Sequence, residues 1–422
     1  MVLGLDRMRE LLTRLGDPQR HLGTVIHVGG TNGKGSTVAM LAAIASAAGV
    51  RTARYSSPHL SSLRERIVVA DEMISEIDFV DHAARVAAAG GDEFTFFEQI
   101  TAIALSYFAE QRVALTLLEV GLGGRLDATN VVDADVAVVT GVDMDHETIL
   151  GTTPQQIAFE KAGIFKVGRG AVIGASGLAT AITHLRAHAR AVGTGPLLVV
   201  EAATVAAVPA VALAGHHQRC NAAAALAALD VLTLQQHPLA PGFSATVRAL
   251  GLAHVQHPGR FERLAGSPMI ILDGAHNPAG AAALAQALCS EPSYQRATTA
   301  LVLAVSADKP VAAMLAALVP AVGLIVATRY QQDRSMPAAD LAGMCSTAIA
   351  TALGLSAQPS PVAVMSAENL PTALAVATSW PGVERIVIAG SLFLVGEART
   401  TLCSAPSDPM LVTDPMGQVV KA

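Results

Sequence analysis

The sequence contains, near its N-terminus, the run Val25-Ile26-His27-Val28-Gly29-Gly30-Thr31-Asn32-Gly33-Lys34-Gly35-Ser36. A short apolar strand, a loop with four glycines and an alanine-rich helix follow one another here. Glycines let backbone N–H groups turn inward around phosphate oxygens, and the helix N-terminus adds a partial positive charge. Lys34 can reach the β- and γ-phosphates, while Ser36 or Thr37 can present a hydroxyl near magnesium. The run therefore predicts a nucleotide phosphate loop formed by Thr31, Asn32, Gly33, Lys34, Gly35 and Ser36.

The loop departs from the generic phosphate-loop pattern G-x-x-x-x-G-K-S/T at two places. Val28 stands where the first glycine belongs, and Gly35 follows the lysine directly. A glycine-rich turn with a solvated lysine is the alternative, but the flanking strand and helix favour phosphate binding.

Short β-branched runs alternate with alanine- and leucine-rich stretches along the chain, a pattern typical of parallel strands joined by crossover helices. The first series of strands is expected at Thr24–Val28, Leu115–Val120, Val136–Gly141 and Ala171–Gly174, with helices near Ser36–Ala48, Phe97–Gln111 and Pro154–Ala162. A second series is expected at Met269–Asp273, Ala300–Val305, Leu324–Thr328, Val362–Met365 and Arg385–Ala389. The class is therefore α/β.

Between the two series lies His257-Pro258-Gly259-Arg260-Phe261, whose Pro-Gly pair indicates a turn or hinge. We expect an N-terminal P-loop ATPase domain with a mostly parallel sheet over residues 1–262. A smaller Rossmann-like α/β domain should cover 263–403. The proline-containing segment 404–422 is expected to be a flexible tail.

Composition excludes several classes of protein. The 422 residues are 52% apolar and 15% charged with a net charge of -6, so no basic surface for nucleic acid or an anionic membrane is expected. The N-terminus lacks the layout of a signal peptide, and no apolar stretch has the length of a membrane helix. The four cysteines are scattered without Cys-x-x-Cys spacing, which favours reduced thiols and a cytoplasmic protein.

Polar side chains stand where predicted strands end. Glu119 ends the apolar run Leu115–Leu118, Asp145-His146 follows the next strand, and Ser57 follows Thr52–Tyr55. Ligands bind at the carboxyl edge of parallel sheets, so these side chains could meet a magnesium ion beside the phosphates. Each also has an ordinary interpretation, namely a turn hydroxyl, a solvated strand end and a surface histidine. From the residues alone both interpretations stay open.

Further motifs accompany the loop in a fixed order. They are Tyr55-Ser56-Ser57-Pro58-His59-Leu60, the block Glu119–Asn130, Asp145-His146, Glu160-Lys161-Ala162-Gly163-Ile164-Phe165, Pro258-Gly259-Arg260 and Asp273-Gly274-Ala275-His276-Asn277-Pro278. With Lys34-Gly35-Ser36, this set resembles the folylpolyglutamate synthase/dihydrofolate synthase branch of the Mur ligase superfamily. The resemblance spans about Leu3 to Gly396.

The resemblance implies an ATP-dependent ligase that joins L-glutamate to a folate or dihydropteroate carboxylate through an acyl phosphate. It implies catalytic roles for Lys34, Lys161 and His276, and magnesium bound by Ser57, Glu119 and His146. It also implies that Lys161 is carbamylated by CO2 and helps to hold a second magnesium, which requires a neutral amine and hence a depressed pKa. On its own, Lys161 near a helix end could simply meet the helix dipole.

The resemblance further implies that Asn221, Arg260 and Asp273 contact the nucleotide, that His276 and Ser391 contact L-glutamate, and that Thr95 and Asp127 lie on the pterin side. A helix N-cap for Asn221 and a hinge salt bridge for Arg260 and Asp273 remain alternatives. Phe393 stands where many members of the family have tyrosine, so one hydroxyl contact is missing.

Two other functions compete with this interpretation. One is a Mur-type amino-acid ligase acting on a different carboxylate, such as a cell-wall precursor, and the other is a non-catalytic nucleotide-binding regulator. Lys34, Glu119, His146 and Lys161 are all present, which disfavours the regulator. The sequence leaves open whether the acceptor is dihydropteroate, a reduced folate or both, and a monomer is expected.

Overall fold

The computed structural model describes residues 4–353 and 362–408, which form two compact units. The first unit comprises residues up to Ala212 together with His217–Gln256, and the second comprises Leu213–His216 and the described residues from His257 onward. The predicted limits were 1–262 and 263–403. The chain instead changes unit at residue 257, and the four residues Leu213–His216, which end at the first residue of α9, belong to the second unit. Most of the predicted tail, 409–422, lies outside the described residues.

The first unit contains an eight-stranded sheet in the order β4-β3-β2-β5-β1-β6-β7-β8. Its strands are β1 (Thr24–Gly29), β2 (Thr52–Tyr55), β3 (Ile67–Val69), β4 (Glu72–Met73), β5 (Leu115–Glu119), β6 (Val136–Val142), β7 (Gly170–Gly177) and β8 (Leu197–Val199). From β2 to β8 every neighbouring pair is parallel, whereas β3 and β4 are antiparallel additions at one edge. β1 lies between β5 and β6, so the loop after β1 opens at the centre of the carboxyl edge.

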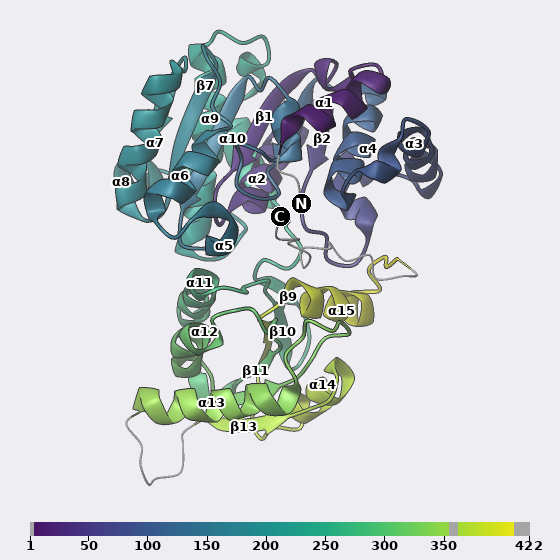
Figure 1. Cartoon of the computed structure of the whole chain (residues 1–422). Helices are drawn as coiled ribbons and strands as arrows, with labels where there is room; N and C mark the ends of the chain where they lie inside the picture. Colours follow the sequence, from purple (N-terminus) through teal and green to yellow (C-terminus); the bar gives the residue numbers. More distant parts are fainter. Residues whose placement is uncertain (1–3, 354–361, 409–422) are drawn as a thin grey trace. The chain divides into compact units, whose positions relative to one another are not determined.

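Helices cover both faces of this sheet (Figure 1). They are α1 (Leu5–Arg14), α2 (Lys34–Ala47), α3 (Glu76–Ala88), α4 (Phe96–Gln111), α5 (Glu147–Leu150), α6 (Pro154–Ala162), α7 (Ala179–Val192), α8 (Ala202–Ala206), α9 (His216–Leu234) and α10 (Ala245–His254). Ala137 and Val139 of β6 belong to one core cluster with α6 and α7. Their neighbours Val136 and Val138 are fully buried on the opposite face. Burial on both faces explains why β6 is apolar throughout rather than alternating.

The second unit contains a six-stranded sheet in the order β13-β12-β11-β14-β10-β9, parallel except for β9. Its strands are β9 (Glu262–Leu264), β10 (Met269–Leu272), β11 (Thr299–Leu303), β12 (Leu324–Ala327), β13 (Ala363–Ser366) and β14 (Arg385–Ala389). Its helices are α11 (Pro278–Cys289), α12 (Val311–Leu318), α13 (Ala338–Leu353), α14 (Leu370–Thr378) and α15 (Leu392–Cys403). One core cluster joins α11, α12 and α13 to Leu301 and Leu303 of β11. The alternate residues Ala300 and Val302 are buried toward the other face, where α14 contacts β11.

The predicted α/β class is confirmed, and every strand expected from the sequence has a counterpart. Short 3-10 segments complete the two units at Pro18–Arg20, Leu63–Arg66, Gly91–Glu93, Ala128–Val131, Ala240–Gly242, Arg296–Thr298 and Val319–Ala321. The alternative that Asn221 is a helix N-cap is wrong, because α9 already begins at His216. In the part of the chain that the structure describes, no helix combines the length and the hydropathy needed to cross a membrane.

Candidate active site

The glycine loop joins β1 to α2 and is hydrogen-bonded to the neighbouring strand β6. The Thr31 amide donates to Gly141 O over 2.9 Å, and the Thr31 hydroxyl accepts from the Asp143 amide over 2.9 Å. From the other side, the Thr140 hydroxyl donates to Asn32 O over 2.7 Å. Sequence reasoning missed Thr140, although a threonine inside an otherwise apolar buried strand is a polar group that requires a partner.

Lys34 of the loop and Lys161 of α6 both donate hydrogen bonds to the backbone oxygen of Gly30. Lys34 Nζ lies 3.2 Å from Gly30 O and 3.1 Å from Thr31 O, and Lys161 Nζ donates to the same Gly30 O over 3.1 Å. Lys161 is only 4% exposed, and its burial, with the charge of Lys34 second, lowers its pKa to about 7. Two positive charges this close repel each other, so the site has a strong electrostatic preference for an anionic ligand.

Two glycines of the loop adopt backbone conformations that only glycine adopts easily. Gly30 has φ 138° and Gly33, the N-cap residue of α2, has φ 84°. A Cβ at Gly30 would lie 1.9 Å from the Thr140 hydroxyl, and one at Gly33 would lie 2.1 Å from Asn221 Oδ1. Asn221, buried inside α9, therefore packs directly on the start of α2 and is held there by a 3.0 Å bond from its Nδ2 to Gln218.

The contact between Gly33 and Asn221 gives a testable prediction. Gly33→Ala should raise the KM for ATP about tenfold or more, because the new methyl group must displace either Asn221 or the loop N–H groups. Gly49→Ala is the matched control, since Gly49 also has a left-handed φ of 69° but no atom lies within 4 Å of its Cβ position. Both variants should lose about 1 kcal/mol of stability from backbone strain. Steady-state kinetics and thermal unfolding separate the two effects, and equal KM values would contradict the prediction.

The predicted magnesium ligands stand at the carboxyl edge of the sheet, after β2, at the end of β5 and after β6. Glu119, the last residue of β5, is 5% exposed, and its Oε2 accepts the backbone N–H of Ser57 over 3.2 Å. His146 follows β6 in a left-handed conformation (φ 52°), with Nε2 3.9 Å from Asp145 Oδ1. Among the described residues, no three His, Cys, Asp or Glu side chains are grouped as metal ligands, so binding by Ser57, Glu119 and His146 stays a prediction.

The fit of the loop to a phosphate and magnesium rests on two observations. The Gly30 carbonyl holds two cations where an anion is expected, and the Thr37 hydroxyl in the first turn of α2 is buried without a hydrogen-bond partner among the described residues. A buried hydroxyl without a partner is rare in a folded protein and indicates a missing ligand or water. The residues therefore fit the predicted nucleotide.

The side chains predicted on the pterin side also hold the local backbone. Thr95 caps α4, and its hydroxyl and backbone N–H both bond Glu98, completing a capping box. Asp127 is 6% exposed and accepts hydrogen bonds from the amides of Leu122 and Thr129. Burial raises the pKa of Asp127. These residues shape the strand-end loops, and their contact with a substrate stays a prediction.

A buried histidine extends the network of Asp127. His27 Nε2 lies 2.8 Å from the Thr129 hydroxyl, which also bonds Asp127. Burial, followed by the charge of Lys166, lowers the pKa of His27 to about 3, so the ring is neutral. Sequence reasoning quoted His27 only as part of the strand, yet a histidine at a fully buried strand position is the signal that could have identified it.

The second unit places three predicted residues, Asp273, His276 and Ser391, after β10 and β14, while Arg260 precedes β9. Both oxygens of Asp273 accept backbone N–H groups, from Phe261 over 2.8 Å and from Ala275 over 2.9 Å, while burial raises its pKa and Arg260 opposes that shift. His276 Nδ1 lies 2.8 Å from Gly274 O, and the buried Ser391 caps α15 by accepting the amide of Phe393. Each side chain thus has a structural partner, and contacts to nucleotide or glutamate stay predictions.

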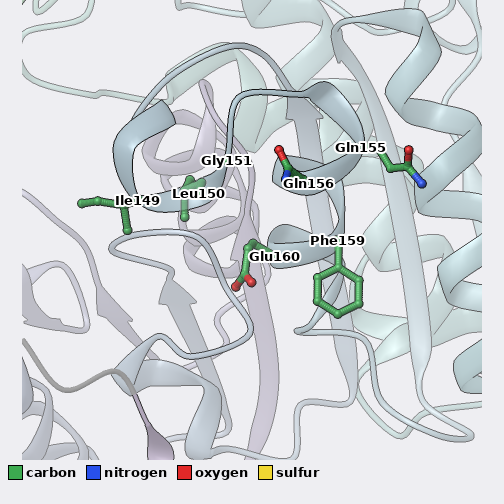
Figure 2. Close-up of a pocket in the computed structure, with 7 residues that line it drawn as sticks. All are labelled: Ile149, Leu150, Gly151, Gln155, Gln156, Phe159 and Glu160. Atoms are coloured by element: carbon green, nitrogen blue, oxygen red, sulfur yellow. The ribbon is translucent and has the colours of Figure 1, made fainter. Parts of the chain in front are cut away.

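A separate pocket of about 470 Å³ lies on α5 and α6 (Figure 2). Its lining consists of Ile149, Leu150, Gly151, Gln155, Gln156, Phe159 and Glu160. Glu160 is bound to Arg125 over 2.8 Å, and the Arg125 guanidinium lies 5.4 Å from the Phe159 ring. None of the predicted site residues belongs to this lining, although Glu160 directly precedes Lys161.

Comparison with known proteins gives two family matches. Residues 28–183 match the Mur ligase middle domain, and residues 261–401 match the dihydrofolate synthetase C-terminal domain. A curated relative from Mycobacterium tuberculosis, a dihydrofolate synthase/folylpolyglutamate synthase, is 36% identical over 94% of this chain and 89% of its own length.

Solved structures agree with the sequence relatives. The chain is similar to Escherichia coli FolC in complex with DHPP and ADP, with a TM-score of 0.81 and 30% identity over 96% of this chain and 94% of that one. It is equally similar to a bifunctional folylpolyglutamate synthase/dihydrofolate synthase with Mn, AMPPNP and L-glutamate bound, with a TM-score of 0.80, 30% identity and coverage of 96% and 95%. The resemblance found in the motifs is confirmed: the chain belongs to the folylpolyglutamate synthase/dihydrofolate synthase family of ATP-dependent glutamate ligases.

Proposed function

We propose that the chain uses ATP to activate the carboxylate of a dihydropteroate or a reduced folate as an acyl phosphate, and then joins it to the amine of L-glutamate. The observation that carries this proposal is the Lys34 ammonium group on Gly30 O, set in a glycine loop that leads into a helix N-terminus. Two anions, a carboxylate and a phosphate, must approach each other in the first step, so positive charge has to be fixed in place beforehand.

The reaction has two steps, phosphate transfer to the acceptor carboxylate and attack by the glutamate amine, and different residues serve each step. In the first, an acceptor oxygen forms a bond to the γ-phosphorus and the bond to the β-phosphate oxygen breaks, while Lys34 and the N–H groups of Gly30–Ser36 offset the charge. In the second, the glutamate nitrogen attacks the acyl carbon, phosphate leaves, and the nitrogen loses a proton. We assign the incoming glutamate to His276 and Ser391, the nucleotide also to Asn221, Arg260 and Asp273, and the pterin side to Thr95 and Asp127.

We propose that one magnesium is held by Ser57, Glu119 and His146 and a second by Lys161 as its carbamate. The magnesium ions would supply positive charge to the phosphate oxygens. A neutral lysine amine adds to CO2, forming an N–C bond and releasing one proton. The pKa of about 7 that burial and Lys34 give Lys161 supports this, because a large fraction of the amine is neutral at physiological pH. The carbamate would also replace the repulsion between Lys161 and Lys34 with attraction.

A direct assay tests the function. ADP release should require both L-glutamate and an acceptor, and we measure it with dihydropteroate and with tetrahydrofolate, each with and without L-glutamate. The comparison also determines whether one acceptor or both are used. The protein is assayed as a single chain in reducing buffer, since we propose a cytoplasmic monomer and its four cysteines are free. Turnover without acceptor, or none with either pterin, would contradict the assignment.

A further inference from the structure

A buried chain of hydrogen bonds runs from a central strand of the first unit to Asp127. His27 lies in β1, and its neighbour on the same face, Val25, packs in one core cluster with the 3-10 segment Ala128–Val131. This packing brings the Thr129 hydroxyl to 2.8 Å from His27 Nε2. The same hydroxyl donates to Asp127 Oδ1, and the Thr129 amide donates to that oxygen over 3.0 Å.

The groups at the two ends of this chain fix the direction of its hydrogen bonds. A carboxylate only accepts hydrogen bonds, so the single proton of the Thr129 hydroxyl points to Asp127. The hydroxyl then accepts from His27, which places the proton of the neutral ring on Nε2. At the other end, Nδ1 of His27 is buried without a hydrogen-bond partner among the described residues. A reversed chain would put an N–H there, and a buried N–H without a partner is rarer in proteins than an acceptor without one.

This arrangement fixes the orientation of the Asp127 carboxylate. Its Oδ1 accepts both the amide and the hydroxyl of Thr129, and its Oδ2 accepts the amide of Leu122 over 2.9 Å. The Thr129 hydroxyl is kept in this direction because His27 supplies its other hydrogen bond. His27 also stands three residues before Gly30, so the chain joins Asp127 to the strand that leads into the phosphate loop.

We propose that His27 and Thr129 are positioning residues for the acceptor subsite, where they hold the Asp127 carboxylate in the orientation that binds the pterin side of the acceptor. The inference rests on the proposed function and on its contact between Asp127 and the acceptor. A pterin ring carries N–H donors, and a carboxylate of fixed orientation selects them by direction as well as by charge. The acceptor carboxylate must also reach the γ-phosphate, so an error in the orientation of the ring is carried to the reacting atoms.

The test compares His27→Met with His27→Gln. Methionine fills the buried space without a donor, whereas the glutamine amide can place an N–H near the position of Nε2. The acceptor is dihydropteroate or tetrahydrofolate, whichever supports turnover in the assay above. His27→Met should raise the KM for this acceptor about tenfold, the size of one weakened hydrogen bond to a charged group, and change the KM for ATP less than about twofold. His27→Gln should restore the KM for the acceptor to within about threefold of the wild type.

His82→Met is the matched control for the loss of a buried histidine. His82 is 3% exposed in the same unit, and its ring contacts Arg85 and Glu110 rather than Asp127. This variant should lose thermal stability and keep a normal KM for the acceptor. Thr129→Val, which keeps the side-chain shape and removes the hydroxyl, should raise that KM as His27→Met does.

A double mutant separates positioning from simple stability. Asp127→Ala should raise the KM for the acceptor, and adding His27→Met should raise it no further, because the histidine acts through Asp127. Additive effects, or a normal KM in His27→Met beside a raised KM in Asp127→Ala, would overturn the inference while the proposed function stands. A normal KM in Asp127→Ala would remove both the pterin contact and the inference. If His27→Met does not fold, Thr129→Val replaces it, and an unchanged KM there also overturns the inference.

The tautomer of His27 is tested without any turnover. NMR of the histidine ring nitrogens, with His27→Gln to assign the signals, should show the proton on Nε2 and none on Nδ1 at neutral pH. A proton on Nδ1 would overturn the inference alone, even in an active enzyme. Absence of wild-type turnover with either pterin would instead contradict the proposed function, and the inference with it.

Discussion

Replacing Lys161 with alanine should lower kcat by at least about a hundredfold, and acetate or propionate should restore part of the lost activity. The side chain is 4% exposed, so its removal leaves a buried space beside Gly30 that a small molecule can enter. If the working form of Lys161 is a carbamate, the missing function is that of a carboxylate. A free carboxylate can replace it, whereas bicarbonate cannot be joined to a lysine that is absent.

The rescue experiment distinguishes the carbamate from a plain ammonium group. Ethylamine is similar in size to acetate but carries a positive charge, like a lysine ammonium group. Rescue by ethylamine and not by acetate would therefore show that Lys161 acts as a cation. Lys166→Ala is the control, because Lys166 is also partly buried with a lowered pKa but bonds only the Asn130 oxygens among the contacts seen. It should lower thermal stability without a response to either additive. Kinetics are measured at fixed ionic strength, since added salt screens exposed charges.

Glu119→Gln should lower kcat/KM by about a hundredfold at low magnesium and raise the magnesium concentration needed for half-maximal rate. Glutamine keeps the shape of the side chain and its oxygen can still accept the Ser57 amide, so the backbone geometry should survive. Only the negative charge is lost. Magnesium is a hard cation that binds carboxylate oxygens, so the loss of this charge should weaken its binding. A saturating concentration of magnesium should therefore recover part of the rate.

Glu98→Gln is the matched control for this variant. Glu98 is buried like Glu119 and lies in the same unit, but it closes the capping box of α4, where glutamine serves equally well. Its magnesium dependence should equal that of the wild type. A Glu119→Gln enzyme with an unchanged magnesium dependence would rule out Glu119 as a ligand, even if its activity were low.

The parts of the fold predicted from sequence are those with a repeated pattern. The strands β1, β5, β6, β11, β12 and β14 are mostly apolar runs of four to seven residues that are buried along their whole length, and such runs are visible in a single sequence. β3, β4, β8 and β9 were missed because they have only two or three residues and lie at or next to the sheet edges. A run of two or three residues is too short to show a repeat of apolar and polar residues, and its pairing depends on strands far away in the chain.

The sequence predicted those parts of the candidate site in which a polar side chain directly follows a strand. Ser57 and Glu119 were expected at one edge, and the structure joins them with a hydrogen bond. Asn221 and Tyr330 illustrate what sequence could not provide. Asn221 meets Gly33 only because α9 packs on the start of α2, and Tyr330 lies in no motif that signals its hydrogen bond with Ser306. Contacts between distant elements depend on packing, which periodicity does not encode.

The bonds from β6 to the glycine loop have a thermodynamic consequence. A glycine-rich segment is the most flexible kind of chain, and ordering it around a ligand normally subtracts conformational entropy from the affinity. Here the protein's own hydrogen bonds from Thr31 and Thr140 fix the loop against β6, so much of that entropy is lost when the domain folds. Loosening either threonine should therefore weaken nucleotide binding chiefly through entropy, with the enthalpy of the phosphate contacts largely preserved.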